Sequence, residues 1–357
     1  MPSPVCRAAG SSGRDASQRG RTEHNNKESL MKMVFKQWLA AIALALLTSL
    51  AHAQYSQIYV FGDSLSDNGN LKAVTQNPQI PERFTNGPVA MELVAAQLGL
   101  SLTPSFHLLP PEAVGGQYGN NYAIAGAVAI DKDGDPATLD INLPSQVNLF
   151  LALNNGYAPA DALYVVFIGG NDLFAAQDLV LNGGFKGSEK AIKRLEKANK
   201  AVEAQIRALA AAGAQHFLLV NAPDIGAAPI TDIKRDIASA QASNWLELLV
   251  TRNLESVSRL LSRIYNTGLA YQAAVLRHDL GVDITEYDLF GFLDDTIGHA
   301  TEYGYTNTTN ACIYLQTQSG TPNPQCDFNS FVFFDEIHPT AVTHQRAAFE
   351  IVQLLSR

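Results

Sequence analysis

The stretch VFGDSLSDNGN, residues 60–70, begins in an apolar run and ends among small and polar residues. The apolar residues before Gly62 predict a buried strand that stops at this glycine. Ser64 then follows at the end of the strand, between an aspartate and a leucine. A serine hydroxyl becomes a good nucleophile only when a base takes its proton and donors stabilise the oxyanion that forms. The rest of the chain has to supply both.

Strand-like and helical stretches alternate along the chain, and this alternation is typical of a parallel α/β sheet. The apolar runs predict strands at 57–61, 122–125, 162–168, 216–220 and 282–287. Apolar residues at helical spacing predict helices at 188–212, about 232–265 and 341–355, the first of them capped by Ser188 and ended by Gly213. We therefore expect the α/β class, as a three-layer α/β/α sandwich.

The first 53 residues differ in composition from the rest. Residues 1–30 are polar and lack periodicity, so we expect an unstructured leader or a misassigned start there. Residues 31–53 place two lysines before an apolar core and end in Ala51-His52-Ala53, the pattern of a secretory signal peptide cleaved after Ala53. Residues 54–357 are predicted to form a single domain, which is secreted or periplasmic.

Net charge argues against polyanionic partners. Cleavage after Ala53 removes seven Lys or Arg residues and three Asp or Glu residues, which changes the net charge from −9 to −13. Such an acidic surface repels nucleic acids and anionic membranes. No later run of eighteen apolar residues follows, so we expect no transmembrane anchor in the mature chain.

Only two of the three cysteines lie beyond the predicted signal peptide. Cys6 precedes it, whereas Cys312 and Cys326 belong to the mature chain. In an exported protein an even number of cysteines favours a disulfide, and we predict one between Cys312 and Cys326. The alternative is two free buried thiols.

The stretch FVFFDEIHPT, residues 331–340, offers a base for Ser64. Asp335 and His338 are three residues apart, directly before Pro339. In a tight loop this spacing lets the carboxylate bond one imidazole nitrogen while the other nitrogen faces outward. The other histidines, His344 among them, have no Asp three residues earlier, and His344 is interpreted as a structural hydrogen-bonding residue.

Donors for an oxyanion follow two other strand-like segments. FIGGND, residues 167–172, presents the side-chain amide of Asn171, and NYAIAGA, residues 121–127, presents the backbone N–H of Gly126. Ser64 adds its own N–H, which we expect at the start of a helix, where the local dipole favours negative charge. Ser64, Asn171 and Asp224 each follow an apolar run, so we expect them at the carboxyl edge of the sheet, where ligands of open α/β sheets bind.

FGDSLSDNGN, NYAIAGA, GGND and DEIHPT, in this order, resemble the four signature blocks of the GDSL, or SGNH, hydrolase family. The resemblance implies Ser64 as nucleophile, Gly126 and Asn171 as oxyanion donors, and Asp335 with His338 as the rest of a triad. It also implies a flavodoxin-like sheet of five parallel strands in the order 2-1-3-4-5. Many relatives carry two glycines where this chain has Ala125-Gly126, which leaves open which of these residues donates.

Metal-dependent chemistry finds little support in the sequence. Asp63, Asp67 and Asn68 are better explained by hydrogen bonding in a polar turn than by a cation site. Residues 131–140 resemble a calcium loop but have a proline where the loop needs glycine, so we interpret them as a surface turn. Zinc motifs are absent. We expect neither a metal nor a cofactor.

These observations predict a secreted serine esterase or lipase, a carboxylic ester hydrolase that acts on small-molecule or lipid esters through an acyl-enzyme. Short acyl, choline and lipid esters all remain open as substrates. One alternative is a phospholipase or acyltransferase that passes the same acyl group to a lipid acceptor. The other is a noncatalytic lipid- or glycan-binding protein.

Overall fold

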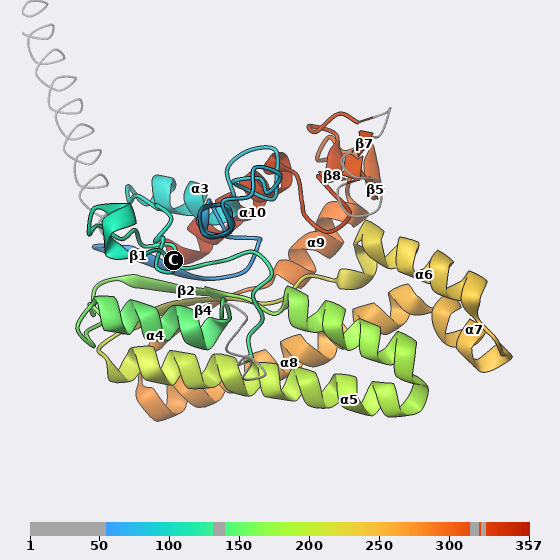
Figure 1. Cartoon of the computed structure of the whole chain (residues 1–357), viewed down its shortest axis with the longest axis horizontal. Coiled ribbons are helices and arrows are strands. Elements are labelled where there is room, and N and C mark those ends of the chain that lie inside the picture. Colours follow the sequence, from blue (N-terminus) through green and yellow to red (C-terminus); the bar gives the residue numbers. More distant parts are fainter. Residues whose placement is uncertain (1–54, 131–139, 315–320, 323–325) are drawn as a thin grey trace, which may run out of the picture. The chain divides into compact units, whose positions relative to one another are not determined.

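Four parallel strands form the central sheet of this computed structural model, which describes residues 55–130, 140–314, 321–322 and 326–357 (Figure 1). The signal-peptide prediction therefore lies outside the described residues. The strands lie in the order β1 (Ile58–Gly62), β2 (Leu163–Phe167), β3 (His216–Val220) and β4 (Asp283–Tyr287). They agree with the predicted ranges to within one residue at either end, and their register brings all four carboxyl ends to one edge of the sheet.

Helices cover both faces of the sheet, which confirms the predicted α/β/α sandwich (Figure 1). Alternate strand residues such as Phe61 and Tyr164 face α4 (Leu143–Leu153), α5 (Gly170–Ala211) and α8 (Leu254–Leu280). Their neighbours, such as Val60 and Val165, face α3 (Ala90–Gln97), α9 (Leu289–Gly298) and α10 (Ala341–Leu355). The other elements are α2 (Asn70–Thr75), α6 (Pro229–Gln241), α7 (Trp245–Arg252), β5 (Asn307–Ala311), β6 (Ile313–Tyr314), β7 (Thr321–Pro322), β8 (Phe331–Phe333) and short 3₁₀ turns at Pro111–Val114 and Ile225–Ala227.

Two helix predictions need correction. The helix expected to begin at Ser188 begins at Gly170 and continues through a break at Gly184, where φ is 53° and ψ is −134°. Ser188 is therefore not a cap, and its hydroxyl donates to the carbonyl of Gly184. The region expected as one helix over about 232–265 is divided into α6, α7 and the first part of α8, because Asn244 accepts a hydrogen bond from the N–H of Glu247 and starts a new helix.

The expected fifth strand is present only as an isolated parallel bridge between Val60 and Asn121. Residues 120–124 do run beside β1, and the N–H of Tyr122 donates to the carbonyl of Val60 at 2.7 Å. At Gly62 the carbonyl still accepts from the N–H of Ile124, at 3.1 Å, but the N–H of Gly62 has a side-chain partner. Gln146 Oε1 accepts from this N–H and Gln146 Nε2 donates to the Gly62 carbonyl, both at 2.8 Å. A side chain thus completes the hydrogen bonding at this edge of β1.

Gln146→Leu tests this assignment, because it leaves the buried N–H of Gly62 without its acceptor. We expect the free energy of unfolding to fall by about 3 kcal/mol, measured by urea denaturation. Asn148→Leu replaces an exposed amide on the same helix and should change that free energy by less than about 0.5 kcal/mol. Equal losses in the two variants would contradict the role of Gln146.

Candidate active site

Ser64 lies in a turn directly after β1. The N–H groups of Ser66 and Asp67 both donate to the carbonyl of Asp63, at 3.1 and 3.0 Å, and close the turn around Ser64. The expectation that Ser64 starts a helix is wrong, because α2 begins only at Asn70. The strand has to end in glycine, since a Cβ at Gly62 would lie 2.3 Å from the carbonyl oxygen of Phe167.

The buried carboxylate of Asp67 fixes this turn to its surroundings. Its Oδ1 accepts from the N–H groups of Gly69 and Asn70, and its Oδ2 accepts from those of Leu71 and Ala125, at 2.8–3.1 Å. Burial raises the pKa of Asp67, while these four hydrogen bonds favour its ionised form. The carboxylate of Asp67 is therefore satisfied by hydrogen bonds within the chain, as the sequence predicted for this polar turn.

His338 and Asp335 lie in the loop between β8 and α10. Asp335 Oδ1 accepts from the backbone N–H groups of Ile337 and His338, and Asp335 Oδ2 lies 2.7 Å from His338 Nδ1. The other ring nitrogen, Nε2, lies 2.7 Å from Ser64 Oγ. The structure thus brings together Ser64, His338 and Asp335, although the first two are 274 positions apart in sequence.

This geometry defines the protonation of the imidazole. A carboxylate accepts but does not donate, so His338 Nδ1 carries a proton toward Asp335, and Nε2 is left to accept the proton of the Ser64 hydroxyl. Burial alone lowers the pKa of His338, but the charges of Asp335, Asp63 and Glu336 and the hydrogen bond to Asp335 raise it above its ordinary value of 6.5. The site therefore stabilises an imidazolium.

Asp63, next to Ser64, is a second buried carboxyl group that the sequence analysis did not assign to the site. Burial raises its pKa to about 7, although the N–H of Leu65 and the charge of His338 both oppose this rise. Near neutral pH its charge is therefore coupled to that of His338. The ring of Phe84, also not anticipated, packs against the imidazole with centroids 5.1 Å apart.

The predicted oxyanion donors lie on two segments that contact each other. Asn171 is in the first turn of α5, and its Nδ2 donates to the carbonyl of Ala127 at 2.9 Å. An amide nitrogen carries two hydrogens, so this contact orients the side chain and leaves one hydrogen. The N–H of Ala125 is taken by Asp67, whereas that of Gly126 meets no acceptor in the described part of the chain. Of this pair, Gly126 is the one with a free N–H.

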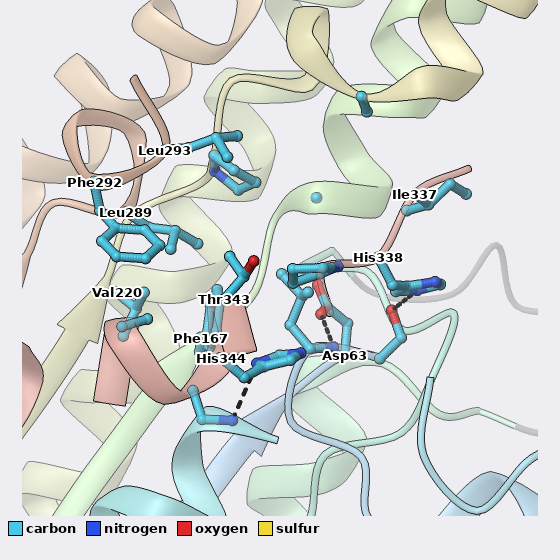
Figure 2. Close-up of a pocket in the computed structure, with 18 of the residues that line it drawn as sticks. Asp63, Phe167, Val220, Leu289, Phe292, Leu293, Ile337, His338, Thr343 and His344 are labelled. Atoms are coloured by element: carbon cyan, nitrogen blue, oxygen red, sulfur yellow. Dashed lines mark hydrogen bonds between the residues drawn. The ribbon is translucent and has the colours of Figure 1, made fainter. Parts of the chain in front are cut away.

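One pocket lies beside Ser64, Asn171 and His338, at the carboxyl ends of the strands (Figure 2). Gly126 does not line it. The strand ends supply Phe167, Val220 and Tyr287, α9 supplies a cluster of apolar side chains, and α10 forms another wall. The apolar side chains from α9 are Leu289, Phe292 and Leu293. Sequence reasoning missed the α9 wall, because apolar residues in a helix do not reveal which neighbour they face.

Asp224 also lines the pocket but is occupied. Its carboxylate accepts from Gly226 N–H and pairs with Arg259, so it holds the loop after β3 in place. Over the described ranges, no group of three or more His, Cys, Asp or Glu side chains could hold a metal ion. Residues 131–139 of the calcium-like stretch lie outside these ranges. Cys312 and Cys326 form the predicted disulfide.

Comparisons with known proteins give the class. The model of the GDSL-like lipase/acylhydrolase family matches residues 58–351, and the chain belongs to this family. This confirms the resemblance drawn from the sequence blocks and the expected class, a carboxylic ester hydrolase.

Individual relatives are more distant. Lipase 1 of Photorhabdus luminescens is 25% identical over 90% of this chain and 53% of its own length, so the chain spans about half of that relative. A GDSL esterase/lipase of Arabidopsis thaliana is 25% identical over 89% of this chain and 94% of its own. The solved structure of an extracellular lipase from Streptomyces rimosus is similar over 85% of this chain and 100% of its own length. The sequence identity is 16% and the TM-score is 0.38.

Proposed function

We propose that the protein is an exported serine esterase in which Ser64, His338 and Asp335 act as a catalytic triad. The observation that carries this proposal is the chain of two 2.7 Å contacts, from Ser64 Oγ to His338 Nε2 and from His338 Nδ1 to Asp335. Nucleophile, base and orienting carboxylate in this arrangement define acyl transfer through a covalent intermediate.

The reaction follows from the positions of the protons. Ser64 Oγ attacks the ester carbonyl while His338 Nε2 takes its proton, and Asp335 stabilises the imidazolium. The N–H groups of Ser64 and Gly126 and the remaining amide hydrogen of Asn171 donate to the oxyanion. His338 then returns its proton to the departing alcohol, which leaves an ester on Ser64. Water attacks that ester with His338 as base, and release of the acid restores the free serine.

The apolar pocket supports the acyl side of the ester as the part that the enzyme binds. Its walls are formed by side chains such as Phe167, Val220 and Phe292, which gain from covering an alkyl chain. Ser64 and His338 line the same pocket, and the ester has to lie beside them. The proposed substrates are therefore esters with an acyl chain long enough to enter this pocket.

Ser64→Ala should reduce ester turnover by at least about 10⁴-fold, because the oxyanion donors and the base then lack a nucleophile. The measurement is kcat/KM on a nitrophenyl ester, with thermal unfolding to verify the fold. Ser66→Ala is the matched control, since this buried serine is two residues away and its hydroxyl has no partner in the described structure. A fluorophosphonate should label the wild type and Ser66→Ala but not Ser64→Ala. Turnover by Ser64→Ala at the wild-type rate would refute the proposal.

The pH dependence should report His338. The base has to be neutral, and because its pKa is raised, kcat/KM should increase with pH through an inflection above 6.5 and fall at lower pH as His338 is protonated. Asp63→Asn removes one charge that raises this pKa while the amide oxygen can still accept from Leu65, so the inflection should move to lower pH. A profile that is flat between pH 5 and 9 would exclude His338 as the base.

Export is the second part of the proposal. It rests on the signal-like residues 31–53 and on the Cys312–Cys326 disulfide, since disulfides persist in oxidising compartments. In the described residues no helix is long and apolar enough to cross a membrane. Expression of the full chain in a secreting bacterial host should give a mature protein that begins at Gln54, as read by N-terminal sequencing. Retention of an intact N-terminus inside the cell would contradict it.

A further inference from the structure

A second histidine, His344, lines the same pocket as Ser64 but takes no part in the proposed triad. It lies in the first turns of α10 and is only 4% exposed. Its Nδ1 accepts a hydrogen bond from the backbone N–H of Ala90, the first residue of α3, at 3.1 Å (Figure 2). An imidazole nitrogen that accepts carries no proton, so in the neutral ring the proton is on Nε2.

His344 stays neutral under ordinary conditions. Burial, with a contribution from the nearby His338, lowers its pKa to about 3. Above this pH the ring is therefore one fixed tautomer, with Nδ1 as an acceptor for Ala90 and Nε2–H as a donor. Neither the protonation nor the orientation has to change when a substrate binds.

The Nε2–H donor has no acceptor among the side chains and backbone groups that the structure describes. The neighbouring Thr343 does not serve, because its hydroxyl is already bonded to the carbonyl of Val332 and to the hydroxyls of Tyr305 and Thr340. A buried donor that stays unpaired is unfavourable. A ligand oxygen that accepts from it would remove this cost, whereas a plain alkyl chain that covers the nitrogen would not.

His344 lies between the two ends of the pocket. In Figure 2 the apolar residues Val220 and Phe292 are on one side of it, and Asp63 and His338 are on the other. His338, whose charge acts on His344, contacts Ser64 Oγ at 2.7 Å, so this donor belongs to the part of the pocket near Ser64. It is therefore placed to contact the part of an acyl chain that is close to the ester carbonyl.

We propose that this pocket is the acyl subsite and that His344 makes it selective for acyl chains with a hydroxyl or keto oxygen near the ester carbonyl, over unsubstituted chains of equal length. The proposal rests on the proposed esterase function of Ser64. The physical reason is the asymmetry of hydrogen bonding in an apolar site: a substrate without the acceptor leaves a buried donor unpaired, and one with it does not.

The experiment compares nitrophenyl acetate, octanoate and 3-hydroxyoctanoate. The ratio of kcat/KM for 3-hydroxyoctanoate to that for octanoate, corrected for the rates of the two esters in alkali, should be about ten in the wild type. The acetate carries no chain beyond its methyl group and serves as the reference for the chemistry itself. A corrected ratio of one or less in the wild type overturns the inference.

Two variants separate recognition from a structural role. His344→Gln places an amide group near the position of Nε2 and should keep most of the preference. His344→Asn places an amide oxygen near Nδ1, so it retains an acceptor for Ala90 but loses the donor, and its ratio should fall to about one. The reverse order would show that His344 only clamps α10 to α3. Should either variant unfold, as judged by thermal denaturation, the wild-type ratio decides alone.

The outcomes distinguish this inference from the function it rests on. If the wild type turns over none of the esters and Ser64 is not labelled by a fluorophosphonate, the proposed function fails. If the acetate is hydrolysed and Ser64 is labelled but the hydroxyl gives no preference, only the acyl selectivity fails.

Discussion

Four backbone N–H groups converge on the buried carboxylate of Asp67, and the geometry of the site depends on this convergence. Three of them come from the segment that follows Ser64, and the fourth comes from Ala125, 58 residues further along the chain. One side chain thus holds the turn that carries Ser64 against the loop that carries Gly126. Because it takes the N–H of Ala125, the N–H of Gly126 is the one of this pair without an acceptor in the described part of the chain.

The electrostatics around the imidazole follow from burial. Asp63, Asp335 and His338 are all buried, and an unpaired charge is unfavourable in a buried position. The two carboxyl groups offset the desolvation of the imidazolium, so the pKa of His338 rises despite its burial. Burial by itself lowers the pKa of an imidazole but raises that of a carboxyl group, and it brings the pKa of Asp63 to about 7. The base that we propose for Ser64 is therefore placed where its charged form is stabilised.

The second histidine shows how the same chemistry gives a different role. His338 has a carboxylate on one nitrogen, whereas His344 has a backbone N–H on the corresponding atom. The first partner favours the cation and directs a lone pair at Ser64. The second partner, a backbone N–H, donates to Nδ1 of His344, so that ring stays neutral and carries its proton on Nε2. Two imidazoles six residues apart thus become an acceptor and a donor in one pocket.

Local sequence patterns predicted much of this protein, because they encode burial and short-range bonding. The apolar runs located the four strands, and the spacing of Asp335 and His338 predicted their contact because it is made within a single turn. The start of α5 and its break at Gly184 were missed, since the glycines of residues 183–184 obscured a helix that continues past them. The resemblance to known signature blocks then placed Ser64 with this pair.

By itself the sequence determined the strand positions, the order of the blocks and the Asp335–His338 pairing, because each depends on residues that are near one another in the chain. Only the tertiary structure decided that Gln146 completes the edge of β1, that Asp67 occupies Ala125, and that α9 lines the pocket. These contacts join residues that are far apart in sequence, and a polar or apolar side chain carries no mark of its distant partner. Folding supplies that partner, and with it the shape of the site.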